Sequence, residues 1–243
     1  MTEVVYGLRA GLAVFEARRE EIVSVAFSHA ARDEAEALVK WASKQRLPCR
    51  ETREDELARV ARSQHHEGLC LVTKPRRFLA PGDLVELLSR RKGTAVALDR
   101  VRNPYNVGAI LRTAAFFGVD AMILGAPAPH PALAPDAVRV AEGGAEHVAL
   151  ARTTDLVATL AKLAERGVAI VGADSHAEID AASFRFPRPV VLVVGHEREG
   201  LGARVRERCS ALVRIRGEGT LDSLNVAVAA GVLIHGMVSS NES

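Results

Sequence analysis

One stretch near the middle of the chain constrains the fold most strongly. Residues 94–98 form an apolar run, residues 119–124 form a second one, and a helical pattern lies between them at 107–117. Strand, loop, helix and strand in this order are the pattern of a parallel α/β unit. The loop and helix after the first run carry polar side chains suited to gripping a ligand: Asp99, Arg100, Arg102, Asn103, Asn106 and Arg112. A loop that only connects two elements needs fewer polar side chains than these.

The same alternation continues to the end of the chain. Further strands are expected at 146–150, 168–173, 189–194 and 211–215, and further helices at 135–142, 154–165, 200–207 and 223–237. A proline-rich loop is expected at 126–135. This order predicts an α/β fold with a mostly parallel sheet and helices on both faces. A hydrophobic content of 48% with only 4% aromatic residues agrees, because buried parallel strands use aliphatic side chains.

The first 75 residues predict a smaller α/β domain. Helices are expected at 5–18, 32–45 and 54–61, and strands at 22–27, 47–51 and 69–73. Pro75, Pro81 and Gly82 interrupt the periodic pattern, so residues 74–82 predict a linker, and Asp83 is a candidate cap for a helix that follows. We therefore expect a small domain at 1–75, a linker with its helix at 76–93 and a larger domain at 94–243.

Composition narrows the class of protein. The three cysteines, Cys49, Cys70 and Cys209, are scattered and have no CxxC spacing, which favours a reduced, cytoplasmic protein without disulfides or a structural zinc site. No apolar run reaches the length of a membrane span, and the N-terminus lacks the pattern of a signal peptide. His196, Glu197 and Glu199 lie close in sequence, but no second cluster at ligand spacing supports a metal site.

Basic residues gather in one part of the chain. The net charge of +2 allows nucleic-acid binding without demanding it. Between residues 74 and 102, Lys and Arg outnumber Asp and Glu, and Arg76, Arg77, Arg100 and Arg102 are the candidates for RNA contacts. Such an excess suits a phosphate backbone, and a solvated linker and helix surface is the alternative.

Three polar stretches each follow a predicted strand. The first, at 99–114, contains Asn106, Gly108, Ala109, Arg112, Thr113 and Ala114. The second, at 195–201, contains Gly195, Glu197, Gly200 and Leu201. The third, at 215–231, contains Ser223, Leu224, Asn225, Val226, Val228, Ala229 and Gly231, with Asp222 or Ser223 as the candidate helix cap. Ligands of open α/β sheets bind at the carboxyl ends of the strands, where these stretches are expected to meet.

These stretches resemble the three sequence motifs of the SpoU/TrmH family, the RNA ribose 2′-O-methyltransferases of the SPOUT class. The resemblance covers residues 94–238. Tyr6-Gly7 and His66-Glu67-Gly68 also resemble short signatures of the accessory substrate-binding domain of that family.

The resemblance implies a fold, a cofactor and a set of site residues. It implies a C-terminal trefoil knot that binds S-adenosyl-L-methionine, in a homodimer whose active site uses both subunits. It implies cofactor contacts from Gly195, Ile215 and Leu224; without it, a turn glycine and two core residues are the alternative. It implies a catalytic Arg112, oriented by Asn106 and by Glu197 as ionic partner, with Ser223 and Asn225 completing the polar wall. The substrate that it favours is rRNA, with tRNA possible.

Two questions stay open in the sequence. Arginine is a poor base because its pKa lies above about 12, so Arg112 either loses its proton in a special environment or positions the phosphate and the 2′-OH. Ile215-Arg216-Gly217 stands where the family usually has Ile-Pro-Met, which raises the alternative of an RNA-binding protein that has lost catalysis. Methylation of a small molecule or a protein is a weaker alternative. The apolar helix at 223–237 suits either a dimer contact or core burial.

Overall fold

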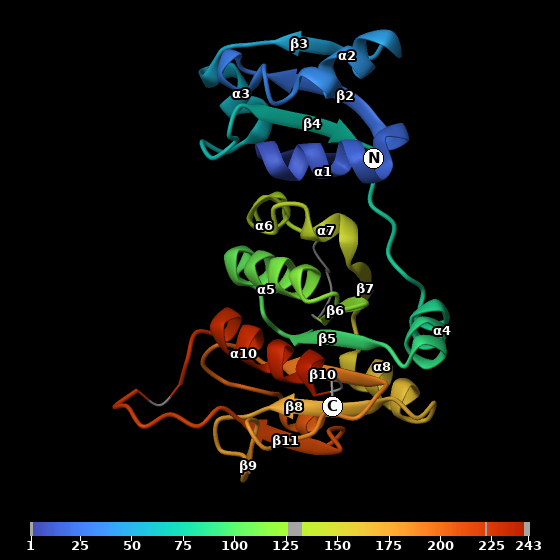
Figure 1. Ribbon diagram of the computed structural model, residues 1–243, viewed down its shortest axis with the longest axis vertical. Helices are drawn as coiled ribbons and strands as arrows, with labels where there is room; N and C mark the ends of the chain where they lie inside the picture. Colours follow the sequence, from blue (N-terminus) through green and yellow to red (C-terminus); the bar gives the residue numbers. More distant parts are fainter. Residues whose placement is uncertain (1, 126–132, 222, 241–243) are drawn as a thin grey trace. The chain divides into compact units, whose positions relative to one another are not determined.

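The computed structural model describes residues 2–125, 133–221 and 223–240. It forms two compact units, and Figure 1 labels most of their helices and strands. The N-terminal unit consists of Met1–Arg77 with Leu133–His147, and the C-terminal unit of Phe78–Ala132 with Val148–Ser243. The chain therefore passes from one unit to the other three times.

The N-terminal unit is built on a four-stranded sheet with the order β1-β4-β2-β3. Its elements are β1 (Glu3–Tyr6), α1 (Leu8–Arg18), β2 (Ile22–Phe27), α2 (Glu36–Lys44), β3 (Cys49–Glu51), α3 (Glu54–Ala61) and β4 (Leu69–Thr73), with 3₁₀ turns at Arg19–Glu21 and His29–Ala31. Strands β1 and β2 run antiparallel to β4, and β3 runs parallel to β2. Helix α3 packs on the face that carries Tyr6 and Cys70. Gly11 of α1 lies against Leu69 and Leu71, which point to the opposite face.

The first element corrects the sequence prediction, which started a helix at residue 5. Val5 and Tyr6 belong to β1, where they pair with Leu71 and Cys70 of β4. Gly7 then adopts a φ of 101°, which ends the strand, and α1 begins at Leu8. The branched and aromatic side chains before Gly7 favour a strand over a helix. The predicted ranges of β2, α3 and β4 are confirmed.

The segment 133–147 packs with the N-terminal unit, whereas the sequence assigned it to the C-terminal domain. It contains α6 (Pro135–Val140) and α7 (Gly144–His147), so residues 146 and 147 are not in the strand predicted at 146–150. The Tyr6 hydroxyl donates a hydrogen bond to the Asp136 carboxylate. The Glu146 carboxylate pairs with Arg18 and Arg76, at 2.8 Å each. These contacts join the segment to β1, to α1 and to the residues after β4.

Arg76 is therefore corrected as an RNA-contact candidate. Its side chain is only 7% exposed, and its guanidinium group donates to the Ala145 carbonyl at 2.6 Å. It also lies 3.4 Å from Glu3. We call the group formed by Glu3, Arg18, Arg76 and Glu146 the buried ion-pair cluster. A guanidinium group committed to two buried carboxylates has no donor directed at an external phosphate.

The C-terminal unit contains a seven-stranded sheet with the order β7-β6-β5-β10-β8-β11-β9. Its strands are β5 (Thr94–Asp99), β6 (Ala121–Gly125), β7 (Ala149–Thr153), β8 (Ala169–Ala173), β9 (Ile179–Asp180), β10 (Val190–Val194) and β11 (Ala211–Arg214). Its helices are α4 (Pro81–Arg91), α5 (Pro104–Phe116), α8 (Leu156–Ala164), α9 (Ala203–Arg206) and α10 (Val226–Ser239). Each pairing between these strands is parallel, which confirms the predicted sheet.

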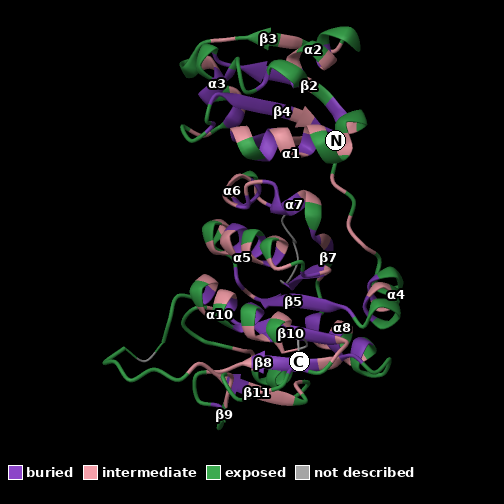
Figure 2. Cartoon of the chain, in the orientation of Figure 1, coloured by how far each residue is buried: buried purple, intermediate pink, exposed green. Residues whose placement is uncertain are grey.

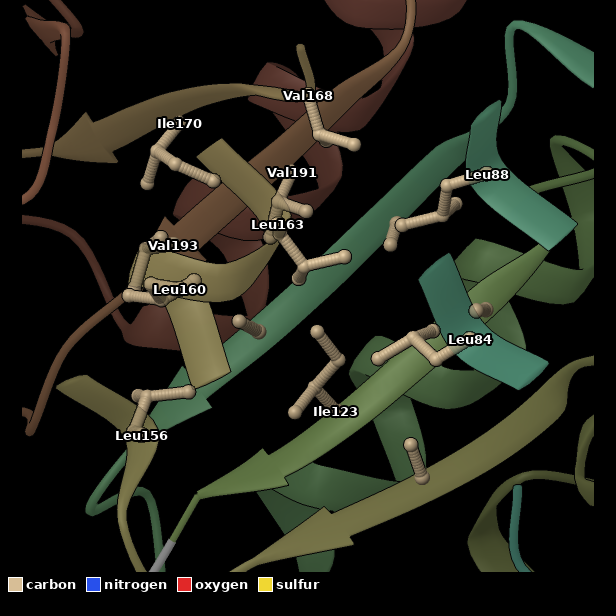
Figure 3. Close-up of a cluster of buried hydrophobic side chains, with 14 of the residues drawn as sticks. Leu84, Leu88, Ile123, Leu156, Leu160, Leu163, Val168, Ile170, Val191 and Val193 are labelled. Atoms are coloured by element: carbon tan, nitrogen blue, oxygen red, sulfur yellow. The ribbon is translucent and has the colours of Figure 1, made fainter. Parts of the chain in front are cut away.

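Aliphatic side chains on both faces hold this sheet together. Leucines from α4 and α8 point toward Ile123, Val191 and Val193 of the strands (Figure 3). Leu192 alternates with these valines and faces the other side, where α10 packs against β10 and α5. Figure 2 shows the strands as largely buried, whereas α5 and α10 each carry both buried and exposed residues. This mixed exposure leaves part of both helices uncovered.

Several element ends differ from the sequence expectation. Helix α4 begins at Pro81 after Ala80, two residues before the expected cap Asp83. Helix α10 is capped by Asn225, not by Ser223, and the other candidate, Asp222, lies outside the described residues. Most of the loop expected at 126–135 also lies outside them. No helix within the described ranges is long and apolar enough to cross a membrane.

Candidate active site

The candidate site lies at the carboxyl ends of three strands of the parallel sheet. Strand β5 leads into residues 100–103, β10 into residues 195–202, and β11 into residues 215–225. Strands β5 and β10 are neighbours, and β8 separates β10 from β11. Because all these strands are parallel, their loops emerge at the same edge of the sheet.

The loop after β5 is ordered by the start of α5. Asn103 is the N-cap, and its side-chain oxygen accepts a hydrogen bond from the Tyr105 amide at 2.9 Å. Pro104 occupies the first turn, where a missing N–H costs nothing. This geometry places Asn106 in the first turn of α5, beside the loop after β10. The Asn106 Nδ2 donates to Glu197 Oε1 at 2.7 Å.

Asn225 joins the third loop to this pair. Its Oδ1 accepts hydrogen bonds from the Ala227 and Val228 amides and so caps α10. Its Nδ2 donates to Asn106 Oδ1 at 3.2 Å. We call Asn225, Asn106 and Glu197 the polar triad. Asn106 is thus hydrogen-bonded through its side chain to Asn225, 119 positions later in the sequence, and to Glu197, 91 positions later.

The other two predicted catalytic residues lie outside the triad. Ser223 is exposed in the loop before α10. Arg112 is exposed on α5, six residues after Asn106, which places the two side chains about 120° apart around the helix. Glu197 makes its short contact with Asn106 and lies 3.9 Å from His196.

The loop after β10 closes on itself. The His196 amide donates to the Gly200 carbonyl at 3.0 Å, and the Gly200 amide donates to the His196 carbonyl at 2.9 Å. We call residues 195–201 the β10 hairpin. A Cβ atom at Gly195 would overlap the Gly200 carbonyl group, so the hairpin itself requires glycine there. Gly195 is buried at the end of β10.

The third loop supplies apolar side chains. Ile215, directly after β11, is half-buried, and Leu224 is 50% exposed. Leu221, which sequence reasoning did not select, is 86% exposed. The sequence signal for Leu221 was the presence of a second leucine, beside Leu224, in an otherwise polar loop. Exposed apolar side chains can pack against a flat aromatic ring, so these residues can flank an adenine.

The arginines predicted to contact RNA differ in whether they pair with other residues of the chain. Arg77 and Arg102 are exposed. Arg100 instead lies against Asp99, Glu199 and the Gly200 carbonyl. Its hydrogen bond to Asp99 raises the pKa of Arg100 further above its usual value. The described side chains include no group of three His, Cys, Asp or Glu residues placed to hold a metal ion.

Family comparison agrees with this geometry. Residues 93–235 match the SpoU rRNA methylase family, and residues 4–79 match the RNA 2′-O ribose methyltransferase substrate-binding family. The chain belongs to the SpoU rRNA methylase family. The matched ranges include all three loops of the site, and the resemblance to SpoU/TrmH enzymes is confirmed.

Individual relatives of this SpoU-family chain extend over nearly its whole length. It is 34% identical to the 23S rRNA (guanosine-2′-O-)-methyltransferase RlmB of Pseudomonas aeruginosa, over 96% of this chain and 94% of that protein. It is 32% identical to the uncharacterized tRNA/rRNA methyltransferase YfiF of Escherichia coli O157:H7, over 95% of this chain and 66% of that protein. The AdoMet-bound rRNA methyltransferase from Sinorhizobium meliloti has the same fold, with a TM-score of 0.80 and 24% identity over 100% of this chain and 88% of that one.

Proposed function

We propose that this chain transfers a methyl group from S-adenosyl-L-methionine to a ribose 2′-OH of ribosomal RNA. The observation that carries this proposal is the polar triad, which joins all three family motifs at one edge of the sheet. The name of the Pseudomonas aeruginosa relative supports the choice of rRNA. Transfer RNA is the second candidate substrate, since the Escherichia coli relative is named for both. We expect the protein to act in the cytoplasm, where its three free cysteines stay reduced.

The residues present fit the cofactor. Gly195 offers buried backbone, and Ile215 and Leu224 offer apolar surface for the adenine ring. S-adenosyl-L-methionine supplies an electrophilic methyl group when bound. The trefoil knot expected of this family would form the cleft around these residues.

Arg112 is proposed as the central catalytic residue. Because an arginine side chain is a poor base, we assign to Arg112 the role of positioning the substrate phosphate and 2′-OH while charge develops on the oxygen. Asn106 and Glu197 form the polar wall of the site that Arg112 would enter, and Asn225 holds Asn106 in place. Ser223 is the remaining candidate for a contact to the ribose. Arg77 and Arg102 are the candidates for contacts to the RNA backbone.

A homodimer is part of this proposal. Val228 and Val232 of α10 are 54% and 48% exposed, and Phe116 at the end of α5 is 82% exposed. A second copy of the chain would cover this apolar face and bring Arg112 to the site of its partner. Light scattering should give twice the mass of the chain, and Val232→Asp should shift that mass toward the monomer.

The alternative of a catalytically inactive RNA-binding protein rests on one feature. Arg216 and Gly217 are exposed where the family usually has proline and methionine, so this loop has more freedom and an added charge near the cofactor residues. Calorimetry with S-adenosyl-L-methionine separates the two functions. A methyltransferase binds it, whereas absence of binding with retained RNA affinity would favour the binder.

The substrate is best found directly. Total RNA from a strain that lacks the protein is incubated with the purified protein and labelled S-adenosyl-L-methionine, and the 2′-O-methyl sites are mapped. The proposal expects label at a defined ribosomal nucleotide. Label only in tRNA would replace the substrate, and absence of label in both RNAs would contradict the proposed reaction.

A further inference from the structure

The residue after β5 has an unusual backbone and an unusual set of partners. Arg100 adopts a φ of 61°, in the left-handed region that favours glycine. Its amide still donates to the Gly125 carbonyl at 3.0 Å, so the backbone is held at the sheet edge. Glycine would adopt this conformation with less strain.

The Arg100 side chain reaches the tip of the β10 hairpin. Its Nη1 lies 2.5 Å from Glu199 Oε2, and its Nη2 donates to the Gly200 carbonyl at 3.1 Å. The same guanidinium group contacts both Asp99 oxygens at 3.3 Å. A planar guanidinium group can make these contacts at once because its donors point in fixed, divergent directions.

Asp99 makes a further contact with the chain after β10. Its side chain is 7% exposed, and its Oδ2 accepts a hydrogen bond from the Gly202 amide at 2.7 Å. The β10 hairpin is thus held at Glu199 and Gly200 by Arg100, and Asp99 holds Gly202, the residue that follows the hairpin. Glu197, a member of the polar triad, lies between these points of attachment and Gly195.

We propose that Arg100 is a positioning residue that holds the β10 hairpin, and through it Glu197 and the cofactor-side backbone, in the geometry needed for methyl transfer. Asp99 is its buried counterpart. This inference rests on the proposed function for the cofactor, and it replaces the expectation that Arg100 contacts RNA. Arg102, two residues further on, is exposed and keeps the RNA role.

The two roles predict opposite effects for the same variant. In Arg100→Gly the backbone conformation is easier to adopt, so folding is not the weak point, and only the side-chain contacts are lost. The positioning role predicts that the dissociation constant for S-adenosyl-L-methionine rises about tenfold, while RNA affinity and its salt dependence stay the same. An RNA contact predicts unchanged cofactor affinity, with weaker RNA binding and a salt slope reduced by about 1.

A measurement without any ligand tests the structural half of the inference. Hydrogen–deuterium exchange of residues 196–202 should be at least about tenfold faster in Arg100→Gly, because the hairpin loses the Arg100 contacts to Glu199 and to the Gly200 carbonyl and opens more often. Arg100→Lys should show an intermediate rate, since an ammonium group cannot bridge the same partners. Arg198→Ala is the matched control, because it removes an exposed arginine of the same hairpin and should change neither exchange nor cofactor affinity.

The outcomes separate this inference from the proposed function. Unchanged exchange in Arg100→Gly would overturn the positioning role, whatever the protein methylates. Faster exchange with unaltered cofactor affinity would overturn its link to the cofactor. If the wild-type protein failed to bind S-adenosyl-L-methionine, the proposed function would fail, and the exchange result would still decide whether Arg100 holds the hairpin.

Discussion

The two units use polar side chains in opposite ways. In the buried ion-pair cluster of the N-terminal unit, Glu146 and Arg76 are 4% and 7% exposed, and their charges are matched inside the chain. In the polar triad of the C-terminal unit, Asn106, Glu197 and Asn225 form hydrogen bonds at a partly exposed strand edge. The first arrangement fixes a segment in place. The second fixes a geometry while leaving its surface available to a ligand.

Mutations in the buried ion-pair cluster and in the polar triad should therefore affect different properties of the protein. Removing one partner of a buried pair leaves an uncompensated charge in a medium of low polarity, which is strongly destabilising. Removing a polar group at an exposed strand edge costs little folding energy, because water replaces the lost contact. Variants of the cluster should therefore change stability with little change in chemistry, and variants of the site should do the reverse.

The largest effect is expected at Arg112. Arg112→Ala should lower single-turnover methyl transfer by about a thousandfold, because it removes a positioned cation from developing charge. Arg112→Lys keeps the charge without the planar donors and should lose about a hundredfold. Cofactor affinity, measured separately by calorimetry, and the melting temperature should stay the same. Near wild-type transfer by either variant would remove Arg112 from the catalytic assignment.

The next effect is expected in the buried ion-pair cluster. Glu146→Gln should lower the free energy of unfolding of the N-terminal unit by about 3–5 kcal/mol, because two buried arginines lose their carboxylate. Trp41, the only tryptophan, lies in this unit, so its fluorescence in a urea titration reports this transition. Glu36→Gln is the control, since Glu36 and its partner Lys40 are 66% and 71% exposed and the expected cost is about 0–1 kcal/mol. Equal losses in the two variants would show that burial does not set the cost of breaking the Glu146 pairs.

A reversal of the Asn106–Glu197 hydrogen bond tests the polar triad. Asn106→Asp retains the acceptor for Asn225 but faces Glu197 with a second carboxylate, and it should lower activity by about a hundredfold. Combination with Glu197→Gln restores a donor between the two positions and should recover about tenfold of that loss. Recovery indicates that the hydrogen bond matters. A double variant as inactive as Asn106→Asp alone would show that the charge of Glu197 is required, as an ionic partner of Arg112 would demand.

The smallest effect is expected at the helix cap of the first loop. Asn103→Ala removes the acceptor for the Tyr105 amide and should lower the free energy of unfolding by about 1 kcal/mol. Asn103→Asp keeps an acceptor and adds a charge that suits the positive end of α5, so its stability should equal or exceed that of the wild type. Thermal unfolding compares the three proteins. A cap that contributed nothing would leave Asn103→Ala at the wild-type melting temperature.

The sequence predicted the parts of the fold that depend on local pattern. The strands β5 and β10 follow from short aliphatic runs that end at polar residues, and the meeting of the three loops follows from the parallel sheet. The choice of cap for α10 could not be made, because Asp222, Ser223 and Asn225 are all capable of capping and lie within four residues.

The partners of the arginines were also hidden from sequence. Arg76 pairs with Glu146, 70 residues later, and Arg100 with Glu199, 99 residues later. A local excess of positive charge does not distinguish an arginine that neutralises a distant carboxylate from one that faces solvent. For the same reason, the grouping of 133–147 with the N-terminal unit could not be predicted from the alternation of strands and helices.

That grouping has a consequence for biosynthesis. Tyr6 finds its hydrogen-bond partner 130 residues later, and Arg18 finds Glu146 128 residues later. A ribosome delivers the chain from its N-terminus, so the first 77 residues emerge well before the segment that neutralises their buried arginines. The N-terminal unit therefore completes its folding only after residue 147 has left the ribosome, when five of the seven strands of the parallel sheet are still to be made. A fragment that ends at Arg77 retains Glu3 but lacks Glu146, the carboxylate that pairs with both arginines at 2.8 Å.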